Sequence, residues 1–333
     1  MKNLLAIKLL FFLLVIYSCD QNSYSPNGID LSSQNSNFYN LFNQVLDNKT
    51  QTFSFPANSG ELCVLSQSGV QICVETDCFE LNGAPLNGGD ISINYIEIFD
   101  QGSMVVTNKT TCDLNTGEML LSGGEFFIEA FQDGLPLSIS ANCGSGGVLN
   151  INPDLSGGID FNMIGWSGSI DADGNLNWTP NLINGDTINV VNCNLNDFPI
   201  GNQTECIYSL PFINGWNNCD VFVSWPSPKT TVTVNTPSEY TGSTSKVFVL
   251  YAGEDGGVVY FPYDGNNSFV SYNETIPVGL DIHILLVAGL SNGTFSYAIE
   301  STTVSENLVV NFSEEDLQIA TVSQMEDLVN LLP

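Results

Sequence analysis

The N-terminal stretch constrains this chain more than any other part of it. Lys2 and Lys8 are followed by an apolar run over residues 9–16 and then by Cys19. A basic start and a short apolar segment are typical of a secretory signal, whereas a transmembrane helix needs about 20 apolar residues. We therefore expect residues 1–18 to be a signal peptide and the remaining chain to fold outside the cytoplasm.

The cysteine that follows this signal supports a second prediction. Ile16-Tyr17-Ser18-Cys19 resembles a bacterial lipobox, in which the cysteine is acylated and becomes the mature N-terminus. Two or more acyl chains hold a protein stably on a bilayer, at about 0.8 kcal/mol per buried CH₂. The alternative is an ordinary signal peptide, with Cys19 left as a thiol. We expect a protein that is anchored to the outer membrane through lipid on Cys19, at the cell surface or at the periplasmic face of the membrane. Residues 19–37 would then form a flexible tether.

The cysteine count agrees with this assignment. Nine cysteines would leave an unpaired thiol in an exported protein, and assigning Cys19 to lipid leaves an even number. The chain has no C-x-x-C pair and one histidine, so disulfides explain the cysteines better than a metal site does. Cys63 and Cys73 flank a turn-like segment and should face each other across a hairpin. We expect four disulfides, with the other pairings open, among Cys63, Cys73, Cys78, Cys112, Cys143, Cys193, Cys206 and Cys219.

The charge balance excludes several classes of partner. Asp and Glu total 36 against six lysines, arginine is absent, and the formal net charge is −30. Such a field repels nucleic acid and anionic headgroups, and without arginine the chain lacks the planar fork that grips phosphate bidentately. We expect no nucleic-acid partner and no phosphoryl transfer. We interpret the acidity as an adaptation for solubility in a salty medium.

The strand and turn pattern predicts an all-β fold. Short alternating apolar segments are separated by turn dipeptides such as Asp133-Gly134 and Asn292-Gly293, and long amphipathic helices are scarce. The length suggests two domains. We expect two β-sandwich domains in tandem over residues 38–156 and 206–312, joined by an inter-domain segment with a hairpin over 157–205.

The C-terminal residues predict the one clear helix of the chain. Ser313-Glu314-Glu315-Asp316 resembles a capping box, with acidic residues in the first turn. Apolar residues then recur at helical spacing as far as Leu332. We expect a C-terminal helix over residues 313–333, packed on the second sandwich.

Two segments resemble a module of Bacteroidetes-type envelope lipoproteins that is related to ZU5-like β-sandwiches. The first covers residues 89–139, and the second, residues 215–220, is similar to a GWxNxD signature. The resemblance implies a ZU5-like β-sandwich over residues 38–156 and an envelope location, but no catalytic residues. Residues 63–78 depart from the opening of the module. The matching positions are Glu97, Asp100, Met104, Thr110, Gly123, Gly124, Glu129, Ala130, Gly134 and Leu137, followed by Gly215, Trp216, Asn218 and Asp220.

Residues suited to catalysis are sparse. The single histidine, His283, shares a strand face with Leu285 and Val287, which predicts a half-buried structural side chain rather than a general base. The chain has no G-x-S-x-G elbow. Carboxylates are numerous enough for a glycosidase pair, but no cluster of acids and aromatic residues points to one. We expect no catalytic residues and no enzymatic activity.

Residues 171–177 contain a weak metal candidate. Asp171, Asp173 and Asn175 alternate as ligands do in calcium loops, but the glycine stands at the fourth position and no glutamate occupies the twelfth. A hairpin turn explains the pattern better, because Asp and Asn favour turns for backbone reasons. We expect no cofactor and no metal, with calcium as the alternative.

The four tryptophans bear on the choice between function hypotheses. Trp166, Trp178, Trp216 and Trp225 would stack on sugars if they were exposed, whereas core filling is the ordinary expectation. The first hypothesis is a non-enzymatic structural or adhesive lipoprotein that presents sandwich loops to a protein or polysaccharide partner. The first alternative is a glycan-binding lipoprotein of a nutrient-uptake system, and the second is a carboxylate-based hydrolase.

Overall fold

Strands dominate the computed structural model of the chain. They make up 47% of it, in several antiparallel sheets with three short α-helices, so the predicted all-β fold with a C-terminal helix is confirmed. The predicted signal peptide, Cys19 and tether lie outside the described residues, apart from Asn37. The structure describes residues 37–113, 116–171, 174–183, 185–193, 206–223, 225, 227–254 and 256–333.

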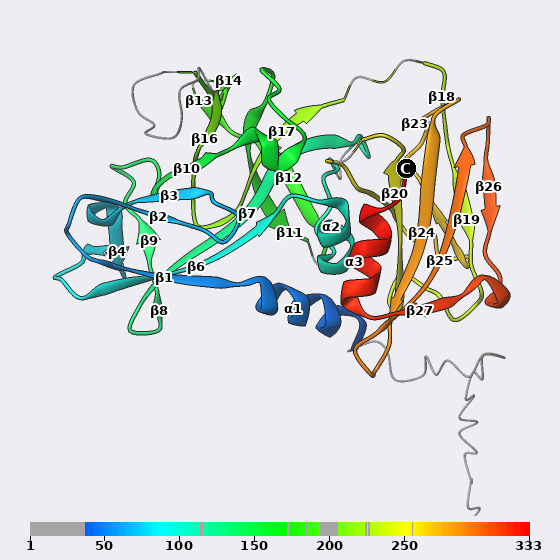
Figure 1. Ribbon diagram of the computed structural model, residues 1–333, viewed down its shortest axis with the longest axis horizontal. Coiled ribbons are helices and arrows are strands. Elements are labelled where there is room, and N and C mark those ends of the chain that lie inside the picture. The colour runs from blue at the N-terminus through cyan, green and yellow to red at the C-terminus, as the bar shows by residue number, and fades with distance from the viewer. Residues whose placement is uncertain are drawn as a thin grey trace, which may run out of the picture.

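The N-terminal sandwich consists of a central sheet and a smaller second sheet (Figure 1). The central sheet contains, in spatial order, β1 (Gln51–Pro56), β6 (Asp90–Ile98), β7 (Leu120–Gln132), β17 (Gly215–Phe222), β11 (Ile164–Ile170) and β12 (Leu176–Pro180), with β8 (Leu135–Pro136) beside β7. The second sheet contains β15 (Val191–Asn192), β16 (Ile207–Pro211), β10 (Gly147–Ile151), β3 (Gln71–Glu75) and β2 (Glu61–Leu65). Short strands flank them: β4 (Phe79–Leu81), β5 (Ala84–Pro85), β9 (Ser138–Ile139), β13 (Leu182–Ile183) and β14 (Asp186–Thr187).

The C-terminal sandwich forms the other lobe of the molecule, at the right of Figure 1. Its larger sheet contains β21 (Val259–Phe261), β20 (Ser245–Tyr251), β24 (Asp281–Gly289), β25 (Phe295–Thr303) and β27 (Gln318–Ala320). Its smaller sheet contains β22 (Ser268–Val270), β19 (Thr233–Asn235) and β26 (Val309–Asn311), and β18 (Lys229–Thr230) pairs with β23 (Ile276–Pro277). The β19–β26 pairing is parallel.

The two lobes share a hydrophobic core. The inner face of the central sheet packs on the second sheet through side chains such as Tyr95 and Phe126. The outer face contributes Trp166 and Trp178 to a separate core, which continues into the C-terminal sandwich through residues such as Phe248. All seven residues of β20 are buried, because the larger sheet of the C-terminal sandwich is covered on both faces.

The lobe boundary differs from the predicted one. The strands β11 and β12 lie within the expected inter-domain segment, and β16 and β17 lie beyond residue 206, yet all four belong to the N-terminal sandwich. This sandwich therefore continues to Phe222. The prediction failed because turn signals mark where strands end, but not which strands pair.

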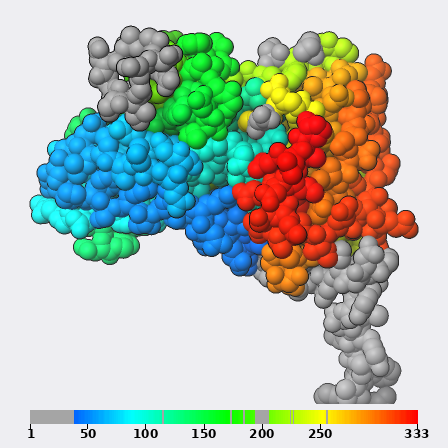
Figure 2. Space-filling model, viewed as in Figure 1, coloured from blue at the N-terminus to red at the C-terminus, as the bar shows by residue number. Residues whose placement is uncertain are grey.

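Three helices occupy the junction between the lobes: α1 (Asn37–Lys49), α2 (Gln101–Thr107) and α3 (Val322–Asn330). In Figure 2, α3 covers the front of the junction and α1 lies below it. The close approach of α3 to α2 requires Gly102, because a Cβ at this position would lie 2.3 Å from the Glu326 carbonyl oxygen. None of the helices in the described ranges is long and apolar enough to span a bilayer.

The C-terminal helix begins later than predicted. The Ser313 capping box forms, but it starts only a 3₁₀ turn over Glu314–Asp316. The chain then adds β27 to the edge of β25, and a second capping box at Thr321 starts α3. Sheet pairing thus replaces the first turns of the predicted helix. The helix contacts β27 of the second sandwich, and it also packs on α2.

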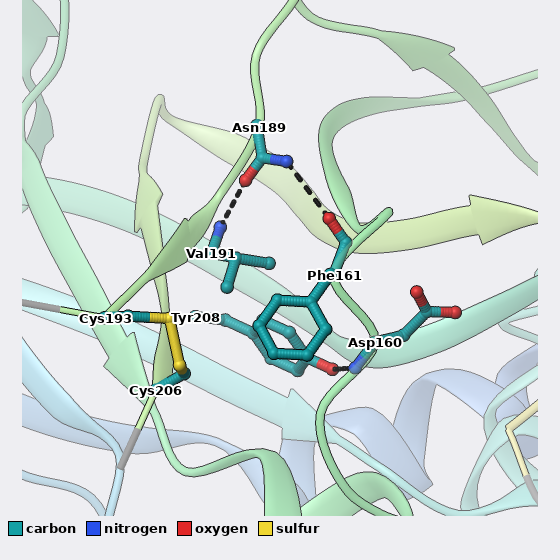
Figure 3. The surroundings of a disulfide bond; sticks show 7 residues. All are labelled: Asp160, Phe161, Asn189, Val191, Cys193, Cys206 and Tyr208. Carbon is teal, nitrogen blue, oxygen red and sulfur yellow. Dashed lines mark hydrogen bonds between the residues drawn. A yellow bond between two sulfur atoms is a disulfide. The ribbon is translucent and has the colours of Figure 1, made fainter. Parts of the chain in front are cut away.

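The described residues form three disulfides, where we expected four. Cys63 pairs with Cys73 across the β2–β3 hairpin as predicted, Cys78 pairs with Cys143, and Cys193 pairs with Cys206. Figure 3 shows the Cys193–Cys206 bond beside Tyr208, whose hydroxyl donates to the carbonyl of Gly158 and accepts from the Asp160 N–H.

The two remaining cysteines are buried free thiols. Cys112 lies in the core between the lobes, whereas Cys219 lies in the core inside the N-terminal sandwich, so the central sheet keeps them apart. Burial raises the pKa of the Cys112 thiol to about 11 and that of Cys219 well above its usual range. Because the thiolate is the reactive form, both side chains behave as small apolar groups.

Candidate functional site

The two lipoprotein-like segments become neighbours in the central sheet. β7 pairs with β17, so Phe127 lies opposite Trp216 and Glu125 opposite Asn218. Alternate residues of a strand point to the same face. Phe127, Glu125, Trp216 and Asn218 therefore share the outer face, which looks toward the helices and the C-terminal lobe.

A β-bulge interrupts this pairing and explains the adjacent glycines. The register shifts between Asn218 and Asp220. Gly124 has a φ of +133°, and a Cβ there would lie 2.6 Å from the Phe126 ring. A Cβ on Gly123 would be only 3.1 Å from the Cys219 carbonyl oxygen. The Gly-Gly pair is needed where the bulge re-aims the following side chains.

Polar side chains gather beneath this bulge without reaching solvent. The Ser122 hydroxyl donates to Asn218 Oδ1 (2.9 Å), and Asn218 Nδ2 donates to Asp220 Oδ2 (2.6 Å). Both carboxylate oxygens of Glu125 and Oδ1 of Asp220 have no hydrogen-bond partner. Burial raises the pKa of Glu125 to about 8, and burial together with Glu125 raises the pKa of Asp220 well above its usual range.

Two other positions of the lipoprotein-like pattern have structural roles. Glu97 accepts hydrogen bonds from Ser66 and the Ser68 N–H, so it anchors the β2–β3 turn to β6. Asp100 is the N-cap of α2 and also accepts a hydrogen bond from Asn330 of α3 (2.7 Å). Both residues thus connect neighbouring elements, and neither lines the pocket described below.

A pocket of about 830 Å³ opens between α1 and the outer face of the central sheet. Its walls come from α1, β6, β7, β17, the turn after α2 and the loops around Gly174 and Gly242. Trp216 and Lys109 are buried at its floor, whereas Asn43 and Ser243 are exposed at its mouth. The size is in the usual range for a small-molecule site.

The floor of the pocket pairs a cation with aromatic rings. Lys109 Nζ lies 5.5 Å from the centroid of Trp216, whose ring is 5.3 Å from that of Phe127. Asn108 caps α2 in the left-handed conformation and turns the chain, so that Lys109 follows it back toward the sheet. Burial lowers the pKa of Lys109 to about 8. The nearby Glu125 carboxylate acts in the opposite direction and raises this pKa, whereas the Lys246 ammonium lowers it further.

The candidate calcium loop is a turn beside this pocket. Asp171 Oδ1 and Oδ2 accept from the N–H and side-chain amide of Asn175, as the hairpin interpretation predicts. Lys246 Nζ donates to Asn175 Oδ1 (2.5 Å), so this candidate ligand oxygen has an ammonium partner. Asp173 lies outside the described residues.

Two tryptophans are ordinary core residues. Trp166 and Trp178 are 0% and 1% exposed, and their indole N–H groups donate to the carbonyls of Asp220 and Thr110. The half-buried Trp225 packs edge-on against Tyr251. Trp216, at 6% exposed, is the member of the four that lines the pocket.

The single histidine has no link to the pocket. His283 is buried in β24, where Nδ1 hydrogen-bonds Ser301 Oγ (2.7 Å) and Nε2 hydrogen-bonds the Pro333 oxygen (2.8 Å). Both ring nitrogens are occupied, which agrees with a structural role.

Sequence reasoning singled out Trp216 but missed Lys109, Glu125 and Phe127. One usable signal was the scarcity of cations: with six lysines and no arginine, each lysine beyond residue 18 is a candidate for a specific role. The alternation in β7 was also visible, but its outer face could not be assigned without its partner strand. Comparison with protein-family models, curated proteins and solved structures yields no match.

Proposed function

We propose that this protein is a non-enzymatic, lipid-anchored envelope protein that binds a ligand between α1 and the central sheet. The pocket itself carries the proposal, because it is concave and combines aromatic and aliphatic side chains with a comparable number of polar ones. Convergent polar groups beside apolar and aromatic walls can fix the orientation of a bound ligand. The signal-like residues 1–18 and Cys19 support the envelope location.

A glycan unit is the ligand class that we favour. Tyr39 and Trp216 offer ring surface, and Asn43, Asn94 and Asn108 place amide groups in the same lining. A sugar presents apolar ring faces and a rim of hydroxyls, so it uses both kinds of group. Among the hypotheses drawn from the sequence, the glycan-binding lipoprotein of a nutrient-uptake system therefore moves to first place.

A protein-interaction module is the second candidate. Phe161 is 61% exposed on the loop before β11 and lies beside the Cys193–Cys206 disulfide in Figure 3. Large exposed aromatic side chains are enriched at protein interfaces. Loss of partner capture on Phe161→Ser, with glycan binding unchanged, would favour this candidate as an additional function.

The non-enzymatic role rests on where the acids lie. Glu125 and Asp220 are fully buried and do not line the pocket, whereas Asp47 and Glu129 do. We expect Asp47→Asn and Glu129→Gln to retain ligand binding. Hydrolysis of a bound glycan by the wild-type chain, abolished by either change, would instead support the carboxylate-based hydrolase.

The proposal is tested with a glycan array and one matched pair of variants. Tyr39→Ala removes a ring from the pocket wall, and Phe53→Ala removes a half-buried ring on the inner side of the central sheet. Because an aromatic contact contributes about 0.5–1.5 kcal/mol, Tyr39→Ala should weaken binding roughly 2- to 13-fold, and Phe53→Ala should not. Equal effects of the two variants would contradict binding in this pocket.

Lipid anchoring has its own test. In detergent-phase partitioning, the exported wild-type chain should enter the detergent phase, and the Cys19→Ser chain should stay in water. Identical partitioning of the two chains would remove the anchor from the proposal but leave the pocket unaffected.

A further inference from the structure

The lysines of the folded chain have unequal surroundings. Lys49 pairs with Glu326 (2.6 Å) and Lys229 pairs with Glu118 (3.1 Å). Lys246 donates to Asn175 and lies over the rings of Tyr39 and Tyr260. Lys109 is the remaining lysine beyond residue 18. Among the described residues it makes neither an ion pair nor a hydrogen bond through its side chain.

Lys109 is a buried cation at the pocket floor. It is 6% exposed and lines the pocket, and its Nζ has no hydrogen-bond acceptor or ion-pair partner among the described residues. Its neighbour is the face of Trp216. A buried ammonium costs free energy unless it is paired, so this group has an unfilled requirement for an anion.

The groups around Lys109 set the charge that the pocket accepts. Glu125 and Lys246 are both near enough to change the Lys109 pKa, which Glu125 raises and Lys246 lowers. Asp47 and Glu129 line the same pocket and repel negative charge. The pocket thus offers one ammonium among carboxylates, and the chain has no arginine. Such a site suits a ligand with a single carboxylate better than a phosphate dianion or a polyanion.

We propose that the pocket binds a ring that carries one carboxylate, with the carboxylate on the Lys109 ammonium and the ring against Trp216 and Phe127. This inference rests on the proposed ligand-binding function and specifies its ligand. Two sources share this chemistry: an acidic sugar unit, and an aromatic or alicyclic carboxylic acid. The hydroxyl-binding amides of the lining favour the acidic sugar.

The small number of lysines permits a direct test on the exported chain. Reductive methylation with ¹³C-formaldehyde labels Lys49, Lys109, Lys229 and Lys246, and single Lys→Arg variants assign their NMR signals. The labelled protein is titrated with sodium glucuronate, sodium benzoate, methyl glucoside and sodium chloride at matched ionic strength. We expect glucuronate to move the Lys109 signal saturably and the Lys229 signal not at all.

A variant pair adds a measurement of affinity. Lys109→Gln should weaken glucuronate binding at least about tenfold in calorimetry, because a hydrogen bond to a charged group contributes about 1.5–3 kcal/mol. Lys229→Gln, which removes a lysine outside the pocket, should bind as the wild type does. If Lys109→Gln does not fold, the titration of the wild-type chain still decides the question.

The outcomes separate this inference from the proposed function. A Lys109 response to glucuronate alone supports an acidic sugar, and a response to benzoate as well supports carboxylates on rings in general. Binding of neutral glycans with no response of Lys109 to any carboxylate overturns the inference and leaves the glycan pocket standing. If none of the titrated compounds binds and no glycan on the array binds, both the inference and the proposed ligand-binding function fail. A shift of equal size with chloride also overturns the inference.

Discussion

The two faces of the central sheet bury different chemistry. The inner face is apolar, with Phe126 and Ile128 completely buried against the second sheet. The outer face buries Glu125, Asn218 and Asp220, and several of their oxygens have no partner. An unpartnered buried polar group costs stability, whereas a packed ring contributes to it. The inner face thus holds the fold together, whereas the outer face gives up stability at these buried polar groups.

The largest expected effect comes from breaking the inner face. Phe126→Ala should lower the free energy of unfolding by about 3–5 kcal/mol, because it leaves a cavity in a closed core. Ile319→Ala, at a side chain 56% exposed on β27, should change it by less than about 0.5 kcal/mol. Denaturant titration measures both values. Similar losses in the two variants would show that the inner face is not the main source of stability.

Replacing a buried acid on the outer face should raise the free energy of unfolding instead of lowering it. The folded-state pKa of Glu125, about 8, is above its ordinary value of 4.5, so its protonation stabilises the fold below pH 4.5 and this stabilisation is lost as the pH rises to about 8. Glu125→Gln removes this dependence and should stabilise the protein by on the order of 3 kcal/mol at pH 7.

The measurement is the melting temperature of both chains between pH 4.5 and 8. Asp220 titrates in both chains, and Glu125 helps to raise its pKa, so the difference between the two curves reports Glu125 together with its coupling to Asp220. The pKa of Lys109, lowered to about 8, adds a separate rise in stability above that pH, which this window avoids. Parallel curves would mean that Glu125 is compensated in a way that the unpartnered oxygens do not indicate.

A smaller effect should follow from disturbing the helices that cover the outer face. Gly102→Ala places a Cβ against the Glu326 carbonyl and should destabilise the protein by about 1–3 kcal/mol. Gly165→Ala is the matched control, because the nearest atom to its Cβ is the end of the Leu210 side chain, at 3.2 Å. Thermal unfolding measures the stability of the two variants. An equal loss of stability in both would contradict a special role for the α2–α3 contact.

The smallest effect should come from the half-exposed ion pair that links these helices. Lys49→Gln removes the contact between α1 and Glu326 of α3, and should cost no more than about 1 kcal/mol. This cost should decrease further in high salt. A loss as large as that of Phe126→Ala would reverse the ranking of the two faces.

Local features of the fold were accessible from the sequence. The Cys63–Cys73 hairpin depended on residues ten positions apart, and the turn at Asp171 depended on side chains that bond their own backbone. The C-terminal prediction was half right for the same reason: Ser313 caps a turn, but pairing of residues 318–320 with β25 ends it.

Features that depend on distant pairing were not accessible. The lobe boundary moved because β17 joins β7, and the fourth disulfide is absent because Cys112 and Cys219 lie on opposite sides of one sheet. Lys109 lines a pocket only because α1, the turn after α2 and strands of the central sheet surround it. Such arrangements depend on which segments meet in space, which short-range patterns do not specify.

The amino-acid order alone was enough for the all-β class, the first hairpin disulfide and the prediction of an exported, lipid-bearing N-terminus, because turn chemistry and leader composition act over a few residues. Folding in three dimensions decided which strands meet, which thiols stay apart and which of the described lysines makes no ion pair or hydrogen bond. Those outcomes are set by packing between residues far apart in the chain, and the candidate binding pocket exists only there.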